Sequence, residues 1–344
     1  MDSSSNGSAQ STTNGTSNPN ANRGTVAVTG ATGFVGGHMV RTLVERGWNV
    51  RALSRSREKA AALREREGVT VVAGDIGDAD ALTQLVRGCD AVIHLVGIIR
   101  EAKGQRFDAM HVEATQSVIS ACKRTGVARL VHMSALGVDD EGTTKYQKTK
   151  FKAEQAVRSS GLDWTIFRPS LIHGPDGEFT QMLAQWCRGE IAPWIGIPYF
   201  RRPETEDRVP LGGVDYIDPE VQPIVVTDVA AYFADALERP ETVGEIFNLV
   251  GSERMTWPAL LEHAHEHVPH AKEGLAPLWA PSDISALQAK AADFVGLGGL
   301  LPFDEGMAIM GAQDSVSSLE RVEAFFDRQP MAFRDSFSAY AGKL

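Results

Sequence analysis

The sequence contains few cysteines. Cys89, Cys122 and Cys187 are the three among 344 residues, and no two stand at the spacing of a metal or redox motif. This scarcity excludes a disulfide-stapled secreted domain and a cysteine-ligated zinc module. We therefore expect reduced thiols, packed as small apolar side chains, in a cytoplasmic protein. A peripheral position at the inner face of a membrane is the alternative location.

Long apolar runs and an excess of positive charge are also missing. The formal net charge is −10, which disfavours a general nucleic-acid partner. No stretch has the length and apolarity of a transmembrane span. The nearest, residues 294–311, is interrupted by Asp304 and Glu305. We expect a core segment there, with contact to a membrane surface or a partner protein as the alternative.

The first 23 residues have almost no apolar side chains. They consist mainly of Ser, Asn, Thr and Gly, and a segment of that composition buries too little surface to fold. They lack the apolar run of a secretory signal and the arginine content of a transit peptide. We expect a disordered tail over residues 1–23.

From residue 24 onward, β-branched apolar runs alternate with segments of helical periodicity. The predicted strands are 25–30, 49–55, 69–75, 90–97, 129–135 and 163–170. The predicted helices between them are 35–47, 57–66, 79–88, 108–126 and 144–161. This alternation predicts an α/β fold, in which helices cover both faces of a doubly wound parallel sheet of the Rossmann type.

The domain boundaries follow from that pattern. We expect an NAD(P)-binding Rossmann domain over residues 24–170, to which residues 224–250 return as a further strand and helix. Residues 171–223 and 251–344 are expected to form a smaller, mostly helical C-terminal lobe that meets a substrate or a partner.

A glycine-rich turn joins the first predicted strand to the first helix, where Gly30, Gly33 and Gly36 are spaced as G-x-x-G-x-x-G. Glycines at such a turn let a pyrophosphate approach backbone N–H groups at a helix N-terminus. Because strand, turn and helix are all present, we favour a dinucleotide site over a merely structural turn. The expected cofactor contacts in this segment are Gly30, Thr32, Gly33, Phe34, Val35 and Gly36.

The end of the second predicted strand indicates which dinucleotide binds. An NAD site usually places an acidic residue there, about 20 residues beyond the glycines. This chain has Ser54 instead, followed by Arg55 and Arg57. A guanidinium suits the 2′-phosphate of NADP because it can donate two parallel hydrogen bonds. We therefore expect NADP(H) to be favoured over NAD(H), with a merely solvated Arg55 as the alternative.

The next two strand ends complete the predicted cofactor site, because ligands of such sheets lie beyond the carboxyl ends of the strands. Asp75 is placed to accept a hydrogen bond from the adenine amine, and Ile76 is placed to pack on the ring. Gly97 lets the backbone approach the middle of the cofactor. The contacts expected at the fourth strand end are Leu95, Val96 and Gly97.

The segment TKYQKTK, residues 144–150, places Tyr146 four residues before Lys150. On a helix these side chains share a face, one turn apart. By itself the pair is either surface decoration or a lysine that lowers the pKa of a tyrosine for proton transfer. Its position favours the second interpretation, because it opens the helix after the fifth strand, shortly beyond Ser134 and beside the dinucleotide turn.

Six segments together resemble the extended and atypical branch of the short-chain dehydrogenase/reductase superfamily, which includes NAD-dependent epimerases and dehydratases. They are TGATGFVG, GDIGD, HLVG, HMSALG, YQKTK and RPSLIHGP. More narrowly, VARLVHMSALG, GLDWTIFRPSLIHGP and VQPIVVTDVA resemble the bacterial relatives of the nucleotide-binding accessory subunit of mitochondrial complex I. The resemblance runs from about residue 24 to about residue 250 and extends weakly to the C-terminus.

The resemblance implies a small C-terminal lobe over the nicotinamide and a catalytic set of Ser134, Tyr146 and Lys150. Ser134 would orient a substrate carbonyl, and Tyr146 would act as the general acid/base. Lys150 would lower the pKa of the tyrosine and hold the nicotinamide ribose. Pro169, in the segment that leaves the sixth strand, would contact the nicotinamide end of the cofactor.

One position departs from the family pattern. His111 stands where relatives carry an asparagine that braces the long fourth helix and a water leading to the lysine. This departure and the complex I likeness favour an NADP(H)-preferring binding protein with little or no turnover, attached to a respiratory or quinone-linked assembly. The alternative is an active NADP(H)-dependent oxidoreductase, epimerase or dehydratase on a small carbonyl or sugar-nucleotide substrate. A redox-sensing regulator is a third interpretation, which the retained tyrosine disfavours.

Residues 191–223 are rich in Pro, Gly and aromatic side chains, which predicts a long loop over the mouth of the active site. Trp194, Tyr199 and Phe200 then line an apolar substrate or quinone site, or pack together within the loop.

Histidines are the last feature of interest. His263 and His267 stand at i and i+4, a spacing that can bind metal. Pro269 should end that helix before His270, and no H-E-x-x-H motif is present. We therefore predict no metal site, and we expect His94 to be an ordinary hydrogen-bonded core histidine.

Overall fold

The computed structural model describes residues 23–102, 104–204, 215–294 and 305–344. Residues 1–22 of the predicted disordered tail lie outside the described residues. The same holds for residues 205–214 of the predicted loop and residues 295–304 of the interrupted apolar stretch.

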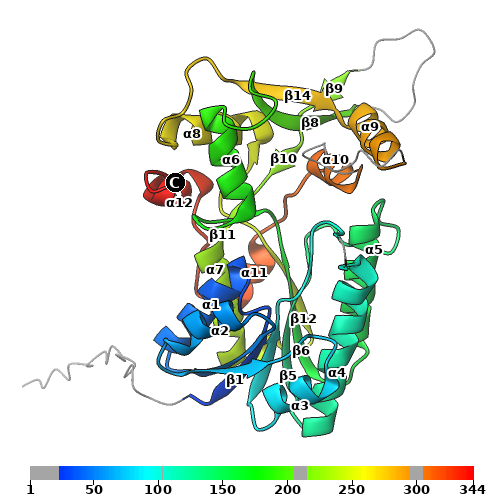
Figure 1. Cartoon of the computed structure of the whole chain (residues 1–344), viewed down its shortest axis with the longest axis vertical. Coiled ribbons are helices and arrows are strands. Elements are labelled where there is room, and N and C mark those ends of the chain that lie inside the picture. Colours follow the sequence, from blue (N-terminus) through cyan, green and yellow to red (C-terminus); the bar gives the residue numbers. More distant parts are fainter. Residues whose placement is uncertain (1–22, 103, 205–214, 295–304) are drawn as a thin grey trace, which may run out of the picture.

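A seven-stranded parallel sheet forms the centre of the larger domain, which occupies the lower part of Figure 1. The strand order is β12-β6-β5-β4-β1-β2-β3. The strands are β1 (Thr25–Thr29), β2 (Asn49–Ser54), β3 (Val69–Ala73), β4 (Ala91–His94), β5 (Arg129–Met133), β6 (Asp163–Pro169) and β12 (Glu245–Leu249). Because the chain order reverses between β1 and β4, the crevice that binds ligands on such sheets opens beside these two strands.

Helices cover both faces of the sheet. The helices of this domain are α1 (Phe34–Glu45), α2 (Arg57–Arg64), α3 (Ala79–Val86), α4 (Ala114–Thr125), α5 (Lys145–Arg158), α7 (Val226–Glu238), α11 (Glu320–Phe325) and the short 3₁₀ turn η2 (Pro240–Thr242). α1, α7 and α11 pack on one face, and α3, α4 and α5 pack on the other. The predicted doubly wound parallel sheet is confirmed.

Local sequence signals set several helix ends. Thr144 and Gln147 form a capping box that begins α5. Gly126, with φ 76°, ends α4 in the left-handed conformation. The predicted long helix over residues 108–126 begins as a π-helical segment, η1 (Asp108–Glu113), which continues into α4. Such π-helical turns occur frequently at functional sites, and this one carries His111.

A smaller lobe lies above the carboxyl ends of the strands (Figure 1). Its helices are α6 (Glu178–Arg188), α8 (Trp257–His267), α9 (Ser282–Phe294), α10 (Glu305–Gly311) and α12 (Phe333–Ala341). Its strands are β8 (Ile197–Pro203), β9 (Tyr216–Ile217) and β14 (Pro277–Pro281). Two short strand pairs link it to the larger domain, β7 (Ile172–His173) with β11 (Ile224–Val225) and β10 (Glu220–Val221) with β13 (Met255–Thr256).

The prediction of a long loop over residues 191–223 is wrong for the described part of that segment. β8 pairs with β14 and with β9, and β10 lies in the same segment. Side chains alternate in direction along a strand, so Tyr199 enters the lobe core, where its hydroxyl donates a hydrogen bond to Asp218 at 2.8 Å. Tyr199 therefore does not line an open substrate site.

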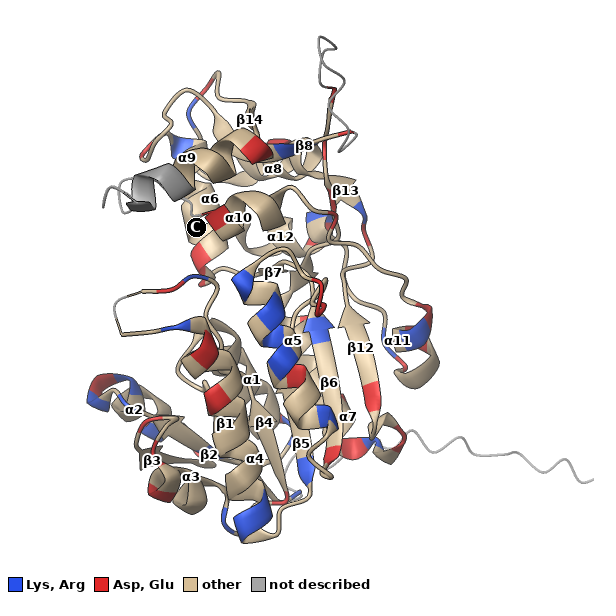
Figure 2. Cartoon of the chain, turned by 90° about the vertical axis from the view of Figure 1, so that its right-hand side faces the viewer, with Lys and Arg blue, Asp and Glu red and all other residues tan. Residues whose placement is uncertain are grey.

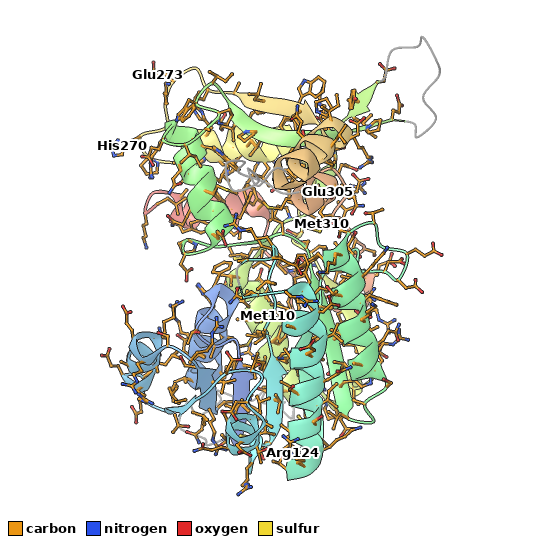
Figure 3. The ribbon with its side chains drawn as sticks, turned by 45° about the vertical axis from the view of Figure 1, so that its right-hand side comes forward. Met110, Arg124, His270, Glu273, Glu305 and Met310 are labelled. Atoms are coloured by element: carbon orange, nitrogen blue, oxygen red, sulfur yellow. The ribbon has the colours of Figure 1, made fainter. Side chains whose placement is uncertain are left out.

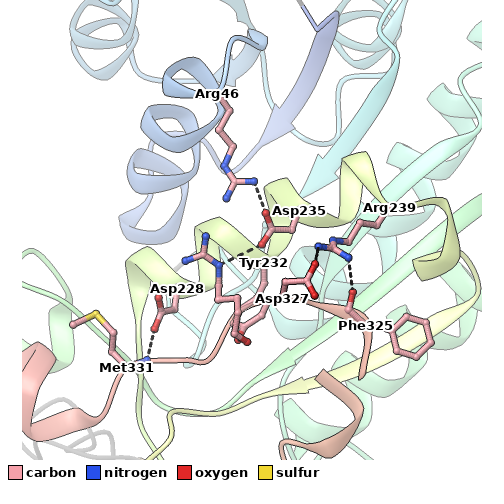
Figure 4. Close-up of polar contacts among 9 residues, drawn as sticks. Arg46, Asp228, Tyr232, Asp235, Arg239, Phe325, Asp327 and Met331 are labelled. Atoms are coloured by element: carbon pink, nitrogen blue, oxygen red, sulfur yellow. Dashed lines mark hydrogen bonds and ion pairs between the residues drawn. The ribbon is translucent and has the colours of Figure 1, made fainter. Parts of the chain in front are cut away.

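The C-terminal segment crosses back over the larger domain before it enters the lobe (Figure 4). Asp235 on α7 binds Arg46 of α1 at 2.5 Å and Arg328 at 3.3 Å. Further along, the backbone N–H of Met331 donates to Asp228 at 2.7 Å. These contacts fasten α12, and with it the lobe, to the faces of α1 and α7.

Charge is unevenly distributed over the surface. The exposed face of α5 carries Lys145, Lys148, Lys152 and Arg158, and Figure 2 shows this helix as a basic stripe. The stripe stands out on a chain whose net charge is −10. In the described part of the chain, no helix combines the length and apolarity needed to span a bilayer. The three cysteines are buried free thiols, as expected.

Candidate active site

The turn between β1 and α1 is so tight that a side chain would not fit at Gly30 or Gly36. Gly30 has φ +78°, a conformation that favours glycine. A Cβ at Gly36 would overlap the carbonyl oxygen of Gly30 and lie 2.7 Å from the Cα of Ala31. Gly33 begins α1, and no described side chain caps the helix there. The first N–H groups of α1 are therefore open to an anionic ligand.

The start of α1 is held in place by the segment that leads into the lobe. The Phe34 ring occupies the space beside Gly174 and Gly177, at 3.1 Å and 2.9 Å from where a Cβ of these glycines would be. His38 binds Asp176 at 2.8 Å. The predicted phosphate-binding turn is thus packed against the connection between the two domains.

The predicted adenosine end of the site contains a hollow of about 310 Å³, lined in part by Arg55, Asp75 and Ile76. Arg55 Nη1 lies 3.6 Å from Asp75 Oδ2, and both side chains are more than half exposed. A pair so exposed contributes at most about 1 kcal/mol, so it gives way readily to a bound phosphate. Ser54 is buried and donates to the carbonyl of Ser56, which leaves Arg55 as the polar group facing outward.

The other residues that line this hollow were not predicted from the sequence. They are Gly77, Gly104, Gln105, Ala109, Met110, Glu113, Ala114 and Ser117. Met110 lies on η1, where Figure 3 labels it. The signal that was overlooked is positional: η1 and the start of α4 face the carboxyl ends of the strands, as every helix N-terminus does on a parallel sheet.

Gly97, just beyond β4, is the point at which several functional side chains meet. A Cβ at this position would lie 3.5 Å from Lys150 Nζ and 3.6 Å from His111 Nε2. The Tyr146 ring lies 5.5 Å from the His111 ring, centroid to centroid. The predicted pair Tyr146 and Lys150 therefore lies at the carboxyl end of the sheet, beside the backbone that was predicted to approach the cofactor.

Lys150 is buried, and its ammonium group donates to the carbonyl oxygen of Met133 at 2.6 Å. Burial lowers the pKa of Lys150 to about 8, and the Glu154 carboxylate partly offsets this effect. Glu154 is itself fully buried in a two-pronged ion pair with Arg168, at 2.6 Å and 2.9 Å. The sequence analysis missed this pair, although Glu154 stands one helical turn beyond Lys150.

Tyr146 lies between aromatic neighbours, with Phe107 at 5.9 Å and His111 at 5.5 Å between ring centroids. Burial raises the pKa of its phenol to about 12. The lowering of this pKa by Lys150, which the family resemblance implied, is not found. The phenol is therefore protonated at neutral pH.

Ser134 is buried, and its hydroxyl has no hydrogen-bond partner among the described residues. Its backbone N–H donates to the carbonyl of Phe167 at 2.7 Å, which fixes the position of the residue at the end of β5. Two residues later, Leu136 N–H donates to the carbonyl of Pro169 at 2.9 Å. A buried hydroxyl without a partner costs about 1–3 kcal/mol, so a ligand that accepted its hydrogen bond would remove this cost.

His111 replaces the expected asparagine and braces three segments at once. Its Nε2 lies 3.0 Å from the carbonyl oxygen of Ile98, and its Nδ1 lies 2.9 Å from the hydroxyl of Thr149 on α5. Burial, and then the charge of Lys150, lower the pKa of His111 to about 3, so the ring is neutral. The histidine thus joins η1, the end of β4 and α5 without adding charge beside Lys150.

Two further histidines lie beneath this cluster. His94 binds the hydroxyls of Thr29 and Thr115 at 2.7 Å and 3.1 Å, which confirms its role as a hydrogen-bonded core residue. His132, its neighbour on β5, stacks on it at 5.3 Å, and neither ring nitrogen of His132 has a partner among the described residues. Burial lowers the pKa of both rings, that of His94 to about 3. We have no physical account of the unpaired His132.

The fold and the glycine turn are those of a dinucleotide-binding Rossmann protein. The comparisons agree with this class: a family model described as NAD(P)H-binding matches residues 30–184. Over this range the chain is similar to the NAD(P)-binding, Rossmann-type short-chain dehydrogenases/reductases and epimerases.

Two relatives show the range of this similarity. The ceramide reductase of Caulobacter vibrioides is 36% identical over 172 residues, which are 50% of this chain and 54% of the relative. The mitochondrial NADH dehydrogenase [ubiquinone] 1 alpha subcomplex subunit 9 of Dictyostelium discoideum is 25% identical over 239 residues, 68% of this chain and 61% of the relative. The chain thus spans just over half of these two relatives.

A solved structure shows the same fold over a longer span. The NADPH-dependent quinone oxidoreductase of Escherichia coli, in complex with NADPH, superposes with a TM-score of 0.65 at 18% identity, over 91% of this chain and 99% of the other. At this identity the likeness concerns the fold alone.

The residues present fit a dinucleotide. The glycine turn leaves room that a side chain at Gly36 would fill, and the uncapped start of α1 faces that room. The hydroxyl of Ser134 lacks a partner at the other end of the crevice. Lys150, held beside Gly97, offers a further hydrogen-bond donor.

Proposed function

We propose that this protein is an NADP(H)-preferring oxidoreductase that reduces a carbonyl group. The observation that carries the proposal is the buried, unpartnered hydroxyl of Ser134, which lies directly after Met133, the residue whose carbonyl holds Lys150. A hydroxyl that has no partner among the described residues can donate to a substrate oxygen. Reductases among the relatives support this choice.

The state of Tyr146 supports reduction as the direction of the reaction. A reduced nicotinamide supplies a hydride when it is bound. The residue that protonates the carbonyl oxygen must then hold a proton, and the phenol of Tyr146 does so because its pKa is about 12. Ser134 donates to the same oxygen and orients it. Lys150, charged below its pKa of about 8, would hold the nicotinamide ribose through a donated hydrogen bond.

The lobe above α5 favours an apolar substrate. Gln313, just beyond α10, donates to Thr143 at 3.2 Å and accepts from Gln147 at 2.9 Å, so this helix is fastened over the start of α5. Figure 3 shows Met310 on the side of α10 that faces α5. Phe200 of β8 lies 3.1 Å from where a Cβ of Gly311 would be, which extends the apolar wall.

The proposal predicts a loss of activity at alkaline pH. Because the pKa of Lys150 lies near 8 in the folded protein, the lysine is charged below this pH and neutral above it. The kcat/KM for NADPH should therefore be constant from about pH 6 to pH 8 and then fall about tenfold per pH unit. Steady-state rates across this range test it. A profile that stays flat to pH 9.5 would remove the charge of Lys150 from the mechanism.

A second prediction concerns cofactor choice. NADPH should bind about 10- to 100-fold more tightly than NADH, the range expected for charge-assisted hydrogen bonds to one phosphate. Arg55→Ala should erase the difference by weakening NADPH alone. Arg64→Ala, at an exposed position in the last turn of α2, is the matched control and should leave the ratio unchanged. Isothermal titration calorimetry measures both affinities; equal values in the unmodified protein would contradict the role of Arg55.

A second candidate function is a nucleotide-binding subunit without turnover in a respiratory or quinone-linked assembly. The similarity to the NADH dehydrogenase subunit, which covers 68% of this chain, favours it. The two candidates differ in one result. A bound NADPH that survives incubation with a broad panel of ketones, aldehydes and quinones supports the subunit, whereas its oxidation at any of them supports the reductase.

A further inference from the structure

We propose that His263, Glu266 and His267, at the C-terminal turn of α8, bind a divalent transition-metal cation of the zinc type. Each offers one ligand atom, and these three atoms lie within 4.8 Å of one another. The site belongs to the small lobe. Figure 1 shows α8, which carries the three residues, in the upper part of the small lobe, away from the parallel sheet.

The helix itself brings the three side chains together. Positions i, i+3 and i+4 share one face of an α-helix, and α8 continues to His267. The two imidazole rings have centroids 4.1 Å apart with an interplanar angle of 36°. The sequence analysis considered the two histidines without a carboxylate and therefore predicted no metal; Glu266, between them on the same face, supplies the third ligand.

Hydrogen bonds already orient both imidazoles for a cation. His267 Nδ1 lies 2.8 Å from the carbonyl oxygen of His263. A carbonyl oxygen only accepts, so Nδ1 carries the proton and Nε2 keeps a lone pair for a metal. His263 uses Nε2 toward Ser338 at 3.2 Å, which leaves its Nδ1 for the cation. Ligating histidines commonly bind a second group of this kind through the other ring nitrogen.

Packing holds the first ligand in place. The His263 ring contacts Phe333 and Phe337 of α12, at 5.9 Å and 6.1 Å between centroids. Glu266 and His267 are exposed, so a cation has free access, and water can complete its coordination shell.

The donor set selects among cations. Two imidazole nitrogens and one carboxylate oxygen match the ligands that Zn²⁺ takes when a fourth position stays open. Cu²⁺ and Ni²⁺ suit the same ligands, while Mg²⁺ and Ca²⁺ require mostly oxygen. The site is independent of the reductase proposal, because no residue of the Ser-Tyr-Lys cluster takes part in it.

Calorimetric titration of the full-length, tag-free chain with ZnCl₂, after removal of metals by a chelator, tests the proposal. We expect one saturable equivalent with micromolar affinity, and no binding heat with MgCl₂ at the same concentrations. His267→Ala should weaken Zn²⁺ binding at least tenfold, and Glu266→Gln should weaken it by a smaller factor. Because both positions are exposed, the variants should unfold at the temperature of the unmodified chain in the absence of metal.

His265→Ala is the matched control. His265 lies on the same helix but binds the carbonyl of Lys272 through Nε2, outside the proposed set. This variant should keep the full Zn²⁺ affinity. The proposal is overturned by a titration without saturable heat, by equal affinities in the unmodified chain and His267→Ala, or by the same loss in His265→Ala as in His267→Ala.

Discussion

Tyr146→Phe should lower NADPH-dependent turnover by about 10³-fold, within the range of general acid catalysis, and leave the affinity for NADPH within about twofold. The substitution removes a single oxygen from a half-buried ring. Its aromatic neighbours Phe107 and His111 keep their contacts, because they meet the ring face and edge rather than the hydroxyl. The measurement is the rate of NADPH oxidation, followed at the absorbance of the reduced nicotinamide, with any carbonyl substrate that the unmodified protein accepts.

Tyr216→Phe is the matched control for this experiment. Tyr216 lies in the small lobe, where its hydroxyl makes a weak contact of 3.4 Å with Asp283. It should leave turnover unchanged. If Tyr146→Phe keeps more than a tenth of the activity, the tyrosine is not the proton donor, and the phenol of pKa about 12 is only a packed core group.

Gly36→Ala should abolish dinucleotide binding and destabilise the domain. The added methyl group would overlap the carbonyl oxygen of Gly30 and come within 2.8 Å of the backbone of Ala31, atoms that cannot move without opening the turn. Overpacking of this kind costs at least about 1–3 kcal/mol of unfolding free energy. Because the same turn presents the open N–H groups of α1, NADPH affinity should fall at least 100-fold, which calorimetry measures directly.

The neighbouring glycine offers a strict control. A Cβ at Gly37 would meet no atom within 4 Å, although Gly37 is the next residue of the same helix. Gly37→Ala should therefore bind NADPH normally and gain about 0.5–1 kcal/mol of stability, the usual advantage of alanine over glycine within a helix. Equal behaviour of the two variants, by thermal unfolding and by calorimetry, would show that the turn does not shape the cofactor site.

The features that could be predicted from sequence are those that depend on local pattern. Alternating buried strands and amphipathic helices specify the parallel sheet, and the topology then places every strand end at one edge. Gly30, Asp75, Gly97 and Lys150 could for this reason be predicted to lie at the carboxyl edge of the sheet without coordinates. Features that depend on tertiary packing, such as the pairing of distant strands and the burial of a side chain, could not be predicted in this way.

Two residues illustrate those failures. Tyr199 belongs to a strand because β14, far away in the sequence, pairs with β8. The pKa of Tyr146 is raised, not lowered, because burial of its hydroxyl group disfavours the charged form. Lys150 is held by the carbonyl of Met133. Neither burial nor a backbone partner can be inferred from the spacing of a tyrosine and a lysine.

His111 still connects the elements around Lys150, although it does so through different contacts from those implied for an asparagine. An asparagine was expected to brace the helix at this position, and the histidine contacts Ile98 and Thr149 instead. The ring is neutral because burial and Lys150 both disfavour its charge. Among the described residues around Gly97, Lys150 is therefore the one cationic side chain. This arrangement is compatible with proton transfer from Tyr146.

A crystal structure of the chain with NADPH tests the central proposal most directly, because it locates both ends of the cofactor at once. We predict the pyrophosphate at the turn from Gly30 to Gly36, the 2′-phosphate on Arg55, and the nicotinamide beside Tyr146 with its ribose on Lys150. A cofactor bound elsewhere, or a nicotinamide turned away from Tyr146 and Ser134, would contradict the proposed carbonyl reductase.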